Sequence, residues 1–136
     1  MKNLNHVNQS KELNIPVELY SFLIKDTYSI LIKGNPGTGK TSLCFAILKA
    51  LKIKSNFSYL TTRVSPKSLF LQYPWMANHF KIKVKQLKSM SEKNNNISFF
   101  EDARLDEPES LFERITSQLM DARSPLIIID SWDAVA

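Results

Sequence analysis

The whole chain contains three glycines, and all three lie in the segment GNPGTGKT, from Gly34 to Thr41. Glycine adopts backbone angles that are closed to other residues, and it leaves the backbone amides open to a close ligand. A chain that places all its glycines in one loop has a strongly specified backbone shape there. The segment matches G-x-x-x-x-G-K-[ST], a pattern typical of loops that bind phosphate.

The context of the loop supports this interpretation. An apolar, β-branched run from Tyr28 to Lys33 predicts a buried strand before it, and apolar residues at helical spacing predict a helix from Thr41 to Leu51 after it. A strand–loop–helix context counts against the alternative, a glycine-rich turn that carries Lys-Thr by chance. We expect successive N–H groups and the positive end of the helix to face a phosphate.

Each residue type in this loop then has an expected role. Lys40 would reach the β- and γ-phosphates as the catalytic cation, and the Thr41 hydroxyl would bind Mg²⁺. The expected nucleotide-binding residues are Gly34, Asn35, Pro36, Gly37, Thr38, Gly39, Lys40, Thr41 and Ser42.

The rest of the chain alternates between strand and helix patterns. Strands are predicted at Phe57 to Thr62, Ile97 to Phe100 and Pro125 to Asp130. A helix is predicted from about Ile15, with four residues near one side: Val17, Leu19, Tyr20 and Leu23. A second is predicted from Pro66, with Ser65 as its N-cap. A third is predicted after Asp106, Pro108 and Glu109, with four residues facing inward: Leu111, Phe112, Ile115 and Leu119. Apolar strands alternating with helices predict an α/β fold with a parallel sheet between helices.

Length and composition indicate how many domains the chain forms and which cellular compartment it fits. The length of 136 residues predicts at most one domain, here residues 15–136, after a polar lead-in at residues 1–14. No apolar run approaches the length of a membrane span, and the N-terminus lacks the apolar stretch of a signal peptide. A single cysteine, Cys44, fits a reducing compartment, so we expect a cytoplasmic protein.

The charge balance selects no partner by itself. A net charge of +5 is compatible with a nucleotide, nucleic acid or an acidic protein. Four lysines in HFKIKVKQLK could meet DNA, but no aromatic residue is interleaved with them, which favours a solvated face: Lys81, Lys83, Lys85 and Lys88. Nucleic acid is therefore a possible partner that the sequence does not favour.

A second motif completes the expected site. Asp130 ends the apolar strand PLIIID, the position from which an acid holds Mg²⁺ in phosphate-loop proteins. An ordinary aspartate that starts a turn is the alternative. Ser131 follows it, whereas a glutamate there would indicate a ring-forming ATPase of the AAA+ kind.

The segments GNPGTGKT, YLTTRVSPKSL and IIIDS together resemble the RecA-like ATPases of the KaiC type, and more narrowly archaeal KaiC-like and gas-vesicle regulatory P-loop proteins. The resemblance implies a RecA-like P-loop NTPase that binds ATP and Mg²⁺. Gly34 to Thr41 would be the Walker A loop and Asp130 the Walker B acid, with Thr41 and Asp130 serving the metal. It also implies a homo-oligomer with ATP at the subunit interface.

One departure from the family pattern bears on catalysis. The family carries a glutamate pair at the end of its second strand, and here Arg63 and Val64 stand at that position. Arginine stays protonated and cannot accept a proton from water. Glu101 and Asp102 follow the third strand, which the family places at the sheet edge, so they are poor substitutes. We expect nucleotide binding with weak hydrolysis.

The resemblance also implies an order of strands. In RecA-like sheets a strand later in sequence lies between the two motif strands, and this chain ends at Ala136. The simplest interpretation is an N-terminal fragment with an incomplete sheet; the alternative is a complete small protein whose motif strands pair directly, as in kinases and GTPases. For function, a regulatory or signalling ATPase module is the main prediction, and a recombinase-like DNA-dependent ATPase and a small-molecule phosphotransferase stay open.

Overall fold

The computed structural model describes residues 15–24, 29–33, 35, 39–91, 93, 95–120 and 126–131 of the chain. The polar lead-in expected at residues 1–14 lies outside them. The chain divides into two compact units, residues 1–53 and residues 54–136. Each unit is described by itself below.

Two helices dominate the described part of the first unit. Helix α2 is Val17–Leu23 and follows Pro16, and helix α3 is Lys40–Ala50. Both confirm the helices predicted from apolar spacing. Their core is aliphatic, with Ile15 and Leu23 buried together with Ile47 and Ala50. Several half-buried residues pack against that core: Leu19, Tyr20, Ile32, Leu43, Ala46 and Leu51.

The strand predicted before the loop is absent from the described residues. Residues 29–33 have no regular secondary structure, and Tyr28 lies outside the description. Ile30 and Leu31 are 40% and 64% exposed, while Ile32 packs on the helical core. A strand is stabilised by backbone pairing with a neighbour, and β-branched composition cannot replace that pairing. The described part of this unit contains no strand that could provide it.

The second unit is built on a parallel sheet of three described strands. These are β1 (Phe57–Thr61), β2 (Phe100–Asp102) and β3 (Leu126–Asp130), in the order β2-β1-β3. Thr61 lies opposite Asp102 on one side and Asp130 on the other, so all three strands end together. The parallel pairing confirms the predicted α/β class.

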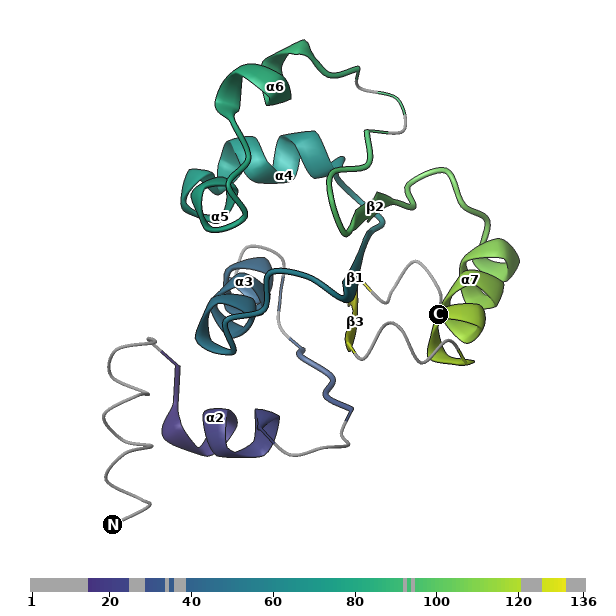
Figure 1. Cartoon of the computed structure of the whole chain (residues 1–136). Helices are drawn as coiled ribbons and strands as arrows, with labels where there is room; N and C mark the ends of the chain where they lie inside the picture. Colours follow the sequence, from purple (N-terminus) through teal and green to yellow (C-terminus); the bar gives the residue numbers. More distant parts are fainter. Residues whose placement is uncertain are drawn as a thin grey trace. The chain divides into compact units, whose positions relative to one another are not determined.

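Helices cover both faces of this sheet (Figure 1). Helices α4 (Pro66–Gln72), α5 (Pro74–His79) and α6 (Val84–Ser89) follow β1, and α7 (Pro108–Met120) lies between β2 and β3 in sequence. Ser65 caps α4 as predicted, because its side chain accepts a hydrogen bond from the Ser68 N–H at 3.1 Å. Leu60, whose side chain is on the opposite face from Tyr59, packs with Ala103, Leu111 and Ile115.

Aromatic rings fill the face of β1 that points toward α4. Phe57 and Tyr59 contact Phe100 of β2, with ring centroids 5.5 and 4.8 Å apart. Phe70 of α4 meets Phe100 edge to face at 4.7 Å, and Phe80 adds a further edge contact at 5.4 Å. These ring contacts form the aromatic part of the second unit's core, and they join β1 to β2 and to α4.

The predicted strand at Ile97 to Phe100 is displaced toward the C-terminus. Ile97 and Phe100 exchange two backbone hydrogen bonds of 3.0 and 2.8 Å across a tight turn, and Ser98 within it has φ 50°. The strand begins at Phe100 and runs to Asp102. The predicted position was wrong because the apolar residues before Phe100 form the turn that leads into the strand, and not the strand itself.

Helix α7 confirms its predicted start but not all of its inward face. Leu111 and Ile115 are buried, whereas Phe112 and Leu119 are 58% and 69% exposed. Adjacent residues are about 100° apart around a helix, so Phe112 turns away from the face that Leu111 presents to the sheet. Just before this helix, the Asp106 carboxylate lies 2.9 Å from the Arg114 guanidinium.

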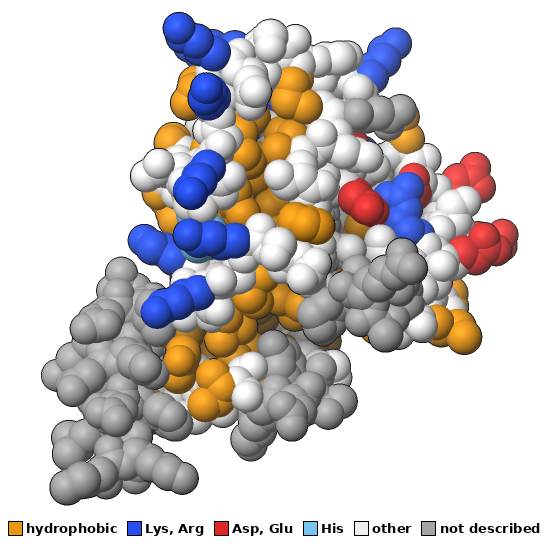
Figure 2. All heavy atoms as spheres, in the orientation of Figure 1, with side chains coloured by type: hydrophobic (Ala, Val, Ile, Leu, Met, Phe, Trp, Pro, Cys, Tyr) orange, Lys and Arg blue, Asp and Glu red, His pale blue; other side chains and the backbone are white. Residues whose placement is uncertain are grey.

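Charge is distributed unevenly over this unit. Lysine and arginine side chains gather over the α4–α6 region and acidic ones over α7 (Figure 2). The four lysines of residues 81–88 are exposed, and none forms an ion pair with a described residue.

Candidate nucleotide-binding site

The start of α3 carries the end of the glycine-rich loop. Gly39 has φ 91° and ψ 21°, in the left-handed region, and stands at the N-cap of the helix. Its carbonyl accepts the Leu43 N–H at 2.9 Å. A Cβ at this position would meet nothing within 4 Å. The glycine is therefore required by the backbone conformation and not by lack of space.

Lys40 is the first residue of the helix, and Thr41 and Ser42 complete its first turn. All three are half-buried. The first N–H groups of a helix have no partner within the helix, and its dipole adds partial positive charge there. An anion bound at this point would meet both the amides and the lysine.

Other expected loop residues are described in part. Asn35 is exposed. The remaining positions lie outside the described residues: Gly34, Pro36, Gly37 and Thr38.

Asp130 ends β3 in the second unit, as the sequence predicts. The Tyr59 hydroxyl donates a hydrogen bond of 2.7 Å to its Oδ2 atom. The Asp130 carbonyl accepts the Thr62 N–H at 2.9 Å, and the Ser131 N–H donates to the Thr62 hydroxyl oxygen at 2.7 Å. These bonds fix both the backbone and the side chain of Asp130 against β1.

The positions at which the KaiC-type resemblance implies a glutamate pair come just beyond the end of β1. Arg63 and Val64 both follow Thr62 and are exposed. Thr61, at the end of β1, lies opposite Asp130, so Arg63 is two residues beyond this pair. The carboxyl ends of parallel strands share one edge of the sheet, and Arg63 follows β1 at that edge. The segment after β1 therefore carries a permanent cation at the position where a carboxylate was expected.

Glu101 and Asp102 are engaged elsewhere. Arg104 holds Asp102 through two side-chain hydrogen bonds of 2.9 and 2.7 Å. Burial raises the pKa of Asp102, but the hydrogen bonds and charge of Arg104 outweigh it, so the pKa lies below its ordinary value. Glu101 accepts a hydrogen bond from Gln118 at 3.3 Å and lies 3.7 Å from Arg114. A carboxylate held by arginine with a lowered pKa is a poor base for activating water.

Tyr59 and Thr62 are functional candidates that the sequence prediction missed. A signal was present, since a tyrosine in a buried strand needs a hydrogen-bond partner for its hydroxyl. The identity of that partner depends on the register of two strands that are distant in sequence.

Asp130 suits Mg²⁺ by its chemistry. Mg²⁺ prefers oxygen donors and is commonly held by one or two carboxylates together with phosphate oxygens and water. Among the described residues, no three His, Cys, Asp or Glu side chains come together as a metal cage. Mg²⁺ in nucleotide sites does not require such a cage, and a carboxylate such as that of Asp130 is a fitting donor by its chemistry.

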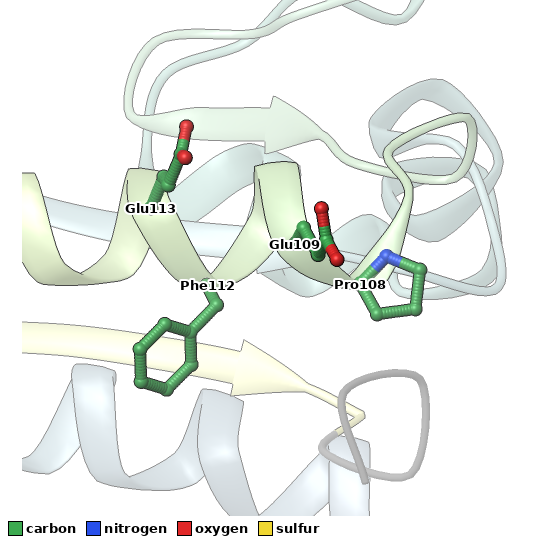
Figure 3. Close-up of a pocket in the computed structure, with 4 residues that line it drawn as sticks. All are labelled: Pro108, Glu109, Phe112 and Glu113. Atoms are coloured by element: carbon green, nitrogen blue, oxygen red, sulfur yellow. The ribbon is translucent and has the colours of Figure 1, made fainter.

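A hollow of about 380 Å³ lies on α7. It is lined by Pro108, Glu109, Phe112 and Glu113, all from the first two turns of the helix, and Phe112 and Glu113 point to opposite sides (Figure 3). A ligand site normally collects polar groups from several elements. This hollow is a depression of the helix surface.

A glycine loop that opens a helix at Lys-Thr, together with a parallel sheet strand that ends in aspartate, defines a P-loop domain of the nucleotide-binding class. Comparison with family models agrees: residues 20–136 match the P-loop domain of the GvpD gas vesicle protein. The chain belongs to this family.

Curated relatives are more distant. The Pachytene checkpoint protein 2 homolog of Arabidopsis thaliana is 38% identical over 88 residues, 60% of this chain and 18% of that protein. Its counterpart in Xenopus tropicalis is 33% identical over 94 residues, 67% of this chain and 21% of that protein. The chain thus spans about a fifth of the curated relatives that it matches. No solved structure matches, and no helix among the described residues has the length and apolarity to cross a membrane.

Proposed function

We propose that this chain binds Mg·ATP as the nucleotide-binding module of a RecA-like, KaiC-type regulatory ATPase. The observation that carries the proposal is the start of α3, where Gly39 in the left-handed region leads directly into Lys40 and Thr41. This is the backbone form that lets amides approach a phosphate, and it occurs in a chain of the GvpD P-loop family.

The roles within the site follow from the chemistry of each residue. Lys40 neutralises the β- and γ-phosphates, and the residues from Gly34 to Ser42 contribute to nucleotide binding. Thr41 and Asp130 serve the Mg²⁺ ion. We further propose that the protein acts in the cytoplasm as a homo-oligomer with ATP between subunits, as the RecA resemblance implies.

Hydrolysis is proposed to be slow. Arg63 and Val64 stand where the family has its glutamate pair, and Glu101 and Asp102 are held by side chains of Arg114, Gln118 and Arg104. No carboxylate among these residues is arranged to accept a proton from water. We expect steady-state turnover well below about 1 s⁻¹, the lower end for typical enzymes. A turnover above that value would contradict slow hydrolysis while leaving nucleotide binding in place.

The test of binding compares two lysines on the same helix. Lys40→Ala is expected to weaken ATP affinity by about 10- to 100-fold, since charge-assisted hydrogen bonds contribute about 1.5–3 kcal/mol. Lys49→Ala, at the exposed far end of α3, is the matched control and should bind ATP as the wild type does. Isothermal titration calorimetry with ATP, GTP and ADP gives the affinities and the base preference. Equal ATP affinity in wild type and Lys40→Ala would refute the proposal.

DNA separates the recombinase-like alternative from this proposal. Turnover and ATP affinity should not change when single-stranded or duplex DNA is added. A DNA-stimulated turnover, or DNA binding with a steep salt dependence, would favour the recombinase-like function instead.

A further inference from the structure

Tyr59 is the most buried polar side chain beside Asp130. Its relative exposure is 0%, and its ring stacks on Phe100 at a centroid distance of 4.8 Å and an angle of 26°. A ring held this way has almost no freedom to move its hydroxyl. The direction of the O–H group is therefore set by the aromatic cluster of the sheet.

The register explains how this hydroxyl reaches Asp130. Tyr59 lies opposite Ile128, and Asp130 is two residues further along β3. Residues two apart on a strand project from the same face, so Tyr59 and Asp130 are diagonal neighbours on one side of the sheet. The length of the phenol ring spans that diagonal and leaves 2.7 Å between the hydroxyl and Oδ2.

The backbone of Asp130 is fixed separately. Thr62 binds the carbonyl of Asp130 through its N–H and exchanges hydrogen bonds with the backbone of Ser131 through its hydroxyl, at 2.7 and 3.1 Å. Thr62 holds the main chain of Asp130. The hydrogen bond from Tyr59 acts on the side chain instead, and it restricts rotation of the carboxylate about χ1 and χ2.

We propose that Tyr59 is the positioning residue of the Asp130 carboxylate: it orients the acid toward the Mg²⁺ of the bound nucleotide. This inference rests on the proposed function, because it assumes that Asp130 serves the metal. A carboxylate has two oxygens and about four acceptor positions. The hydroxyl of Tyr59 donates to one of these positions, on Oδ2.

The principal test replaces one atom. Tyr59→Phe keeps the buried ring and removes the hydroxyl, while Tyr73→Phe, at the half-buried junction of α4 and α5, is the matched control. The readout is the Mg²⁺ concentration that gives half of the Mg²⁺-dependent gain in nucleotide affinity. Tyr59→Phe should raise it about tenfold, the lower end of the cost of removing a partner from a metal-binding side chain. Affinity without Mg²⁺ should stay the same, which a merely structural defect would not allow.

The outcomes separate the inference from the proposed function. An unchanged Mg²⁺ requirement in Tyr59→Phe, with a raised one in Asp130→Asn, overturns the inference alone. A wild type that binds no nucleotide overturns both. If the wild type binds nucleotide but Mg²⁺ affects neither it nor Asp130→Asn, the role of Asp130 and the inference fail while phosphate binding stands.

A second measurement avoids dependence on the folding of Tyr59→Phe. The chain has four tyrosines, so the ¹⁹F NMR signal of Tyr59 in protein labelled with 3-fluorotyrosine can be assigned by elimination from Phe variants at Tyr20, Tyr28 and Tyr73. Adding Mg²⁺ to the nucleotide-bound protein should shift the Tyr59 signal more than the others. A Tyr59 signal that does not respond to Mg²⁺ would overturn the inference.

Discussion

The unit that carries the glycine loop and the unit that carries Asp130 prepare their functional groups by different means. In the first unit the decisive feature is a backbone conformation, with Gly39 in the left-handed region at the start of α3. In the second it is a set of side-chain hydrogen bonds, from Tyr59 to the carboxylate and from Thr62 to the main chain. The backbone conformation at Gly39 therefore depends on local sequence. The orientation of Asp130 depends instead on strand register and on the core that maintains it.

The largest expected effect comes from the core beneath Tyr59. Phe100→Ala removes a fully buried ring that contacts four other aromatic side chains, and should lower the free energy of unfolding by about 3–5 kcal/mol. Phe112→Ala, on the exposed side of α7, is the matched control and should change it by less than about 0.5 kcal/mol. Urea denaturation followed by circular dichroism measures both. Equal effects would show that the aromatic cluster does not support the second unit.

Asp130→Asn distinguishes the two halves of the proposed site. It should weaken nucleotide affinity about 10- to 100-fold in the presence of Mg²⁺ and leave the Mg²⁺-free affinity unchanged, because the amide is a poorer ligand for the ion. Lys40→Ala should weaken affinity under both conditions. Titration calorimetry with and without EDTA compares them. A loss of Mg²⁺-free affinity in Asp130→Asn would mean that Asp130 affects the loop itself.

The two ends of α3 offer a test of the backbone half. Gly39→Ala forces a side chain to adopt φ 91°, and should lower the free energy of unfolding by about 1–2 kcal/mol and also weaken phosphate binding. Lys52, just beyond the other end of α3, has φ 56° and is exposed. Lys52→Gly should therefore stabilise the protein by up to about 1 kcal/mol. Thermal melting of both variants checks the opposite signs, and a stabilising Gly39→Ala would contradict the strained conformation.

The smallest expected effect is a pH dependence in the second unit. The pKa of Asp102 lies below its ordinary 3.8 in the folded state, because Arg104 outweighs the effect of burial. The ionised carboxylate therefore stabilises the fold at pH values above 3.8, and this contribution disappears as the pH falls through the lower folded value. Urea midpoints measured from about pH 6 to about pH 3 should decline less in Arg104→Gln than in the wild type. Parallel declines would show that this pair is not responsible.

Much of the fold could be predicted from local patterns. The apolar run from Leu126 to Asp130, the Ser65-Pro66 start of α4 and the start of α3 after Gly39 each carry their signal within a few residues. The failures share a different cause. Residues 29–33 have a strand's composition without a described pairing partner, and Phe112 faces outward because the sheet lies against the side of α7 that carries Leu111 and Ile115.

Three features were predicted from the sequence alone: a phosphate-binding loop at Gly34 to Thr41, an acid at the end of β3, and Arg63 and Val64 where the KaiC-type resemblance implies a glutamate pair. These are properties of adjacent residues, because glycine conformations, helix starts and strand ends are set within a few peptide units. The hydrogen bond from Tyr59 to Asp130 could not be predicted from local sequence, because it joins residues 71 positions apart and exists only once parallel strands have taken one register out of several. The contact of Glu101 with Gln118 of α7 likewise exists only in the tertiary structure. Asp102, in contrast, is held by Arg104, two residues further along the chain.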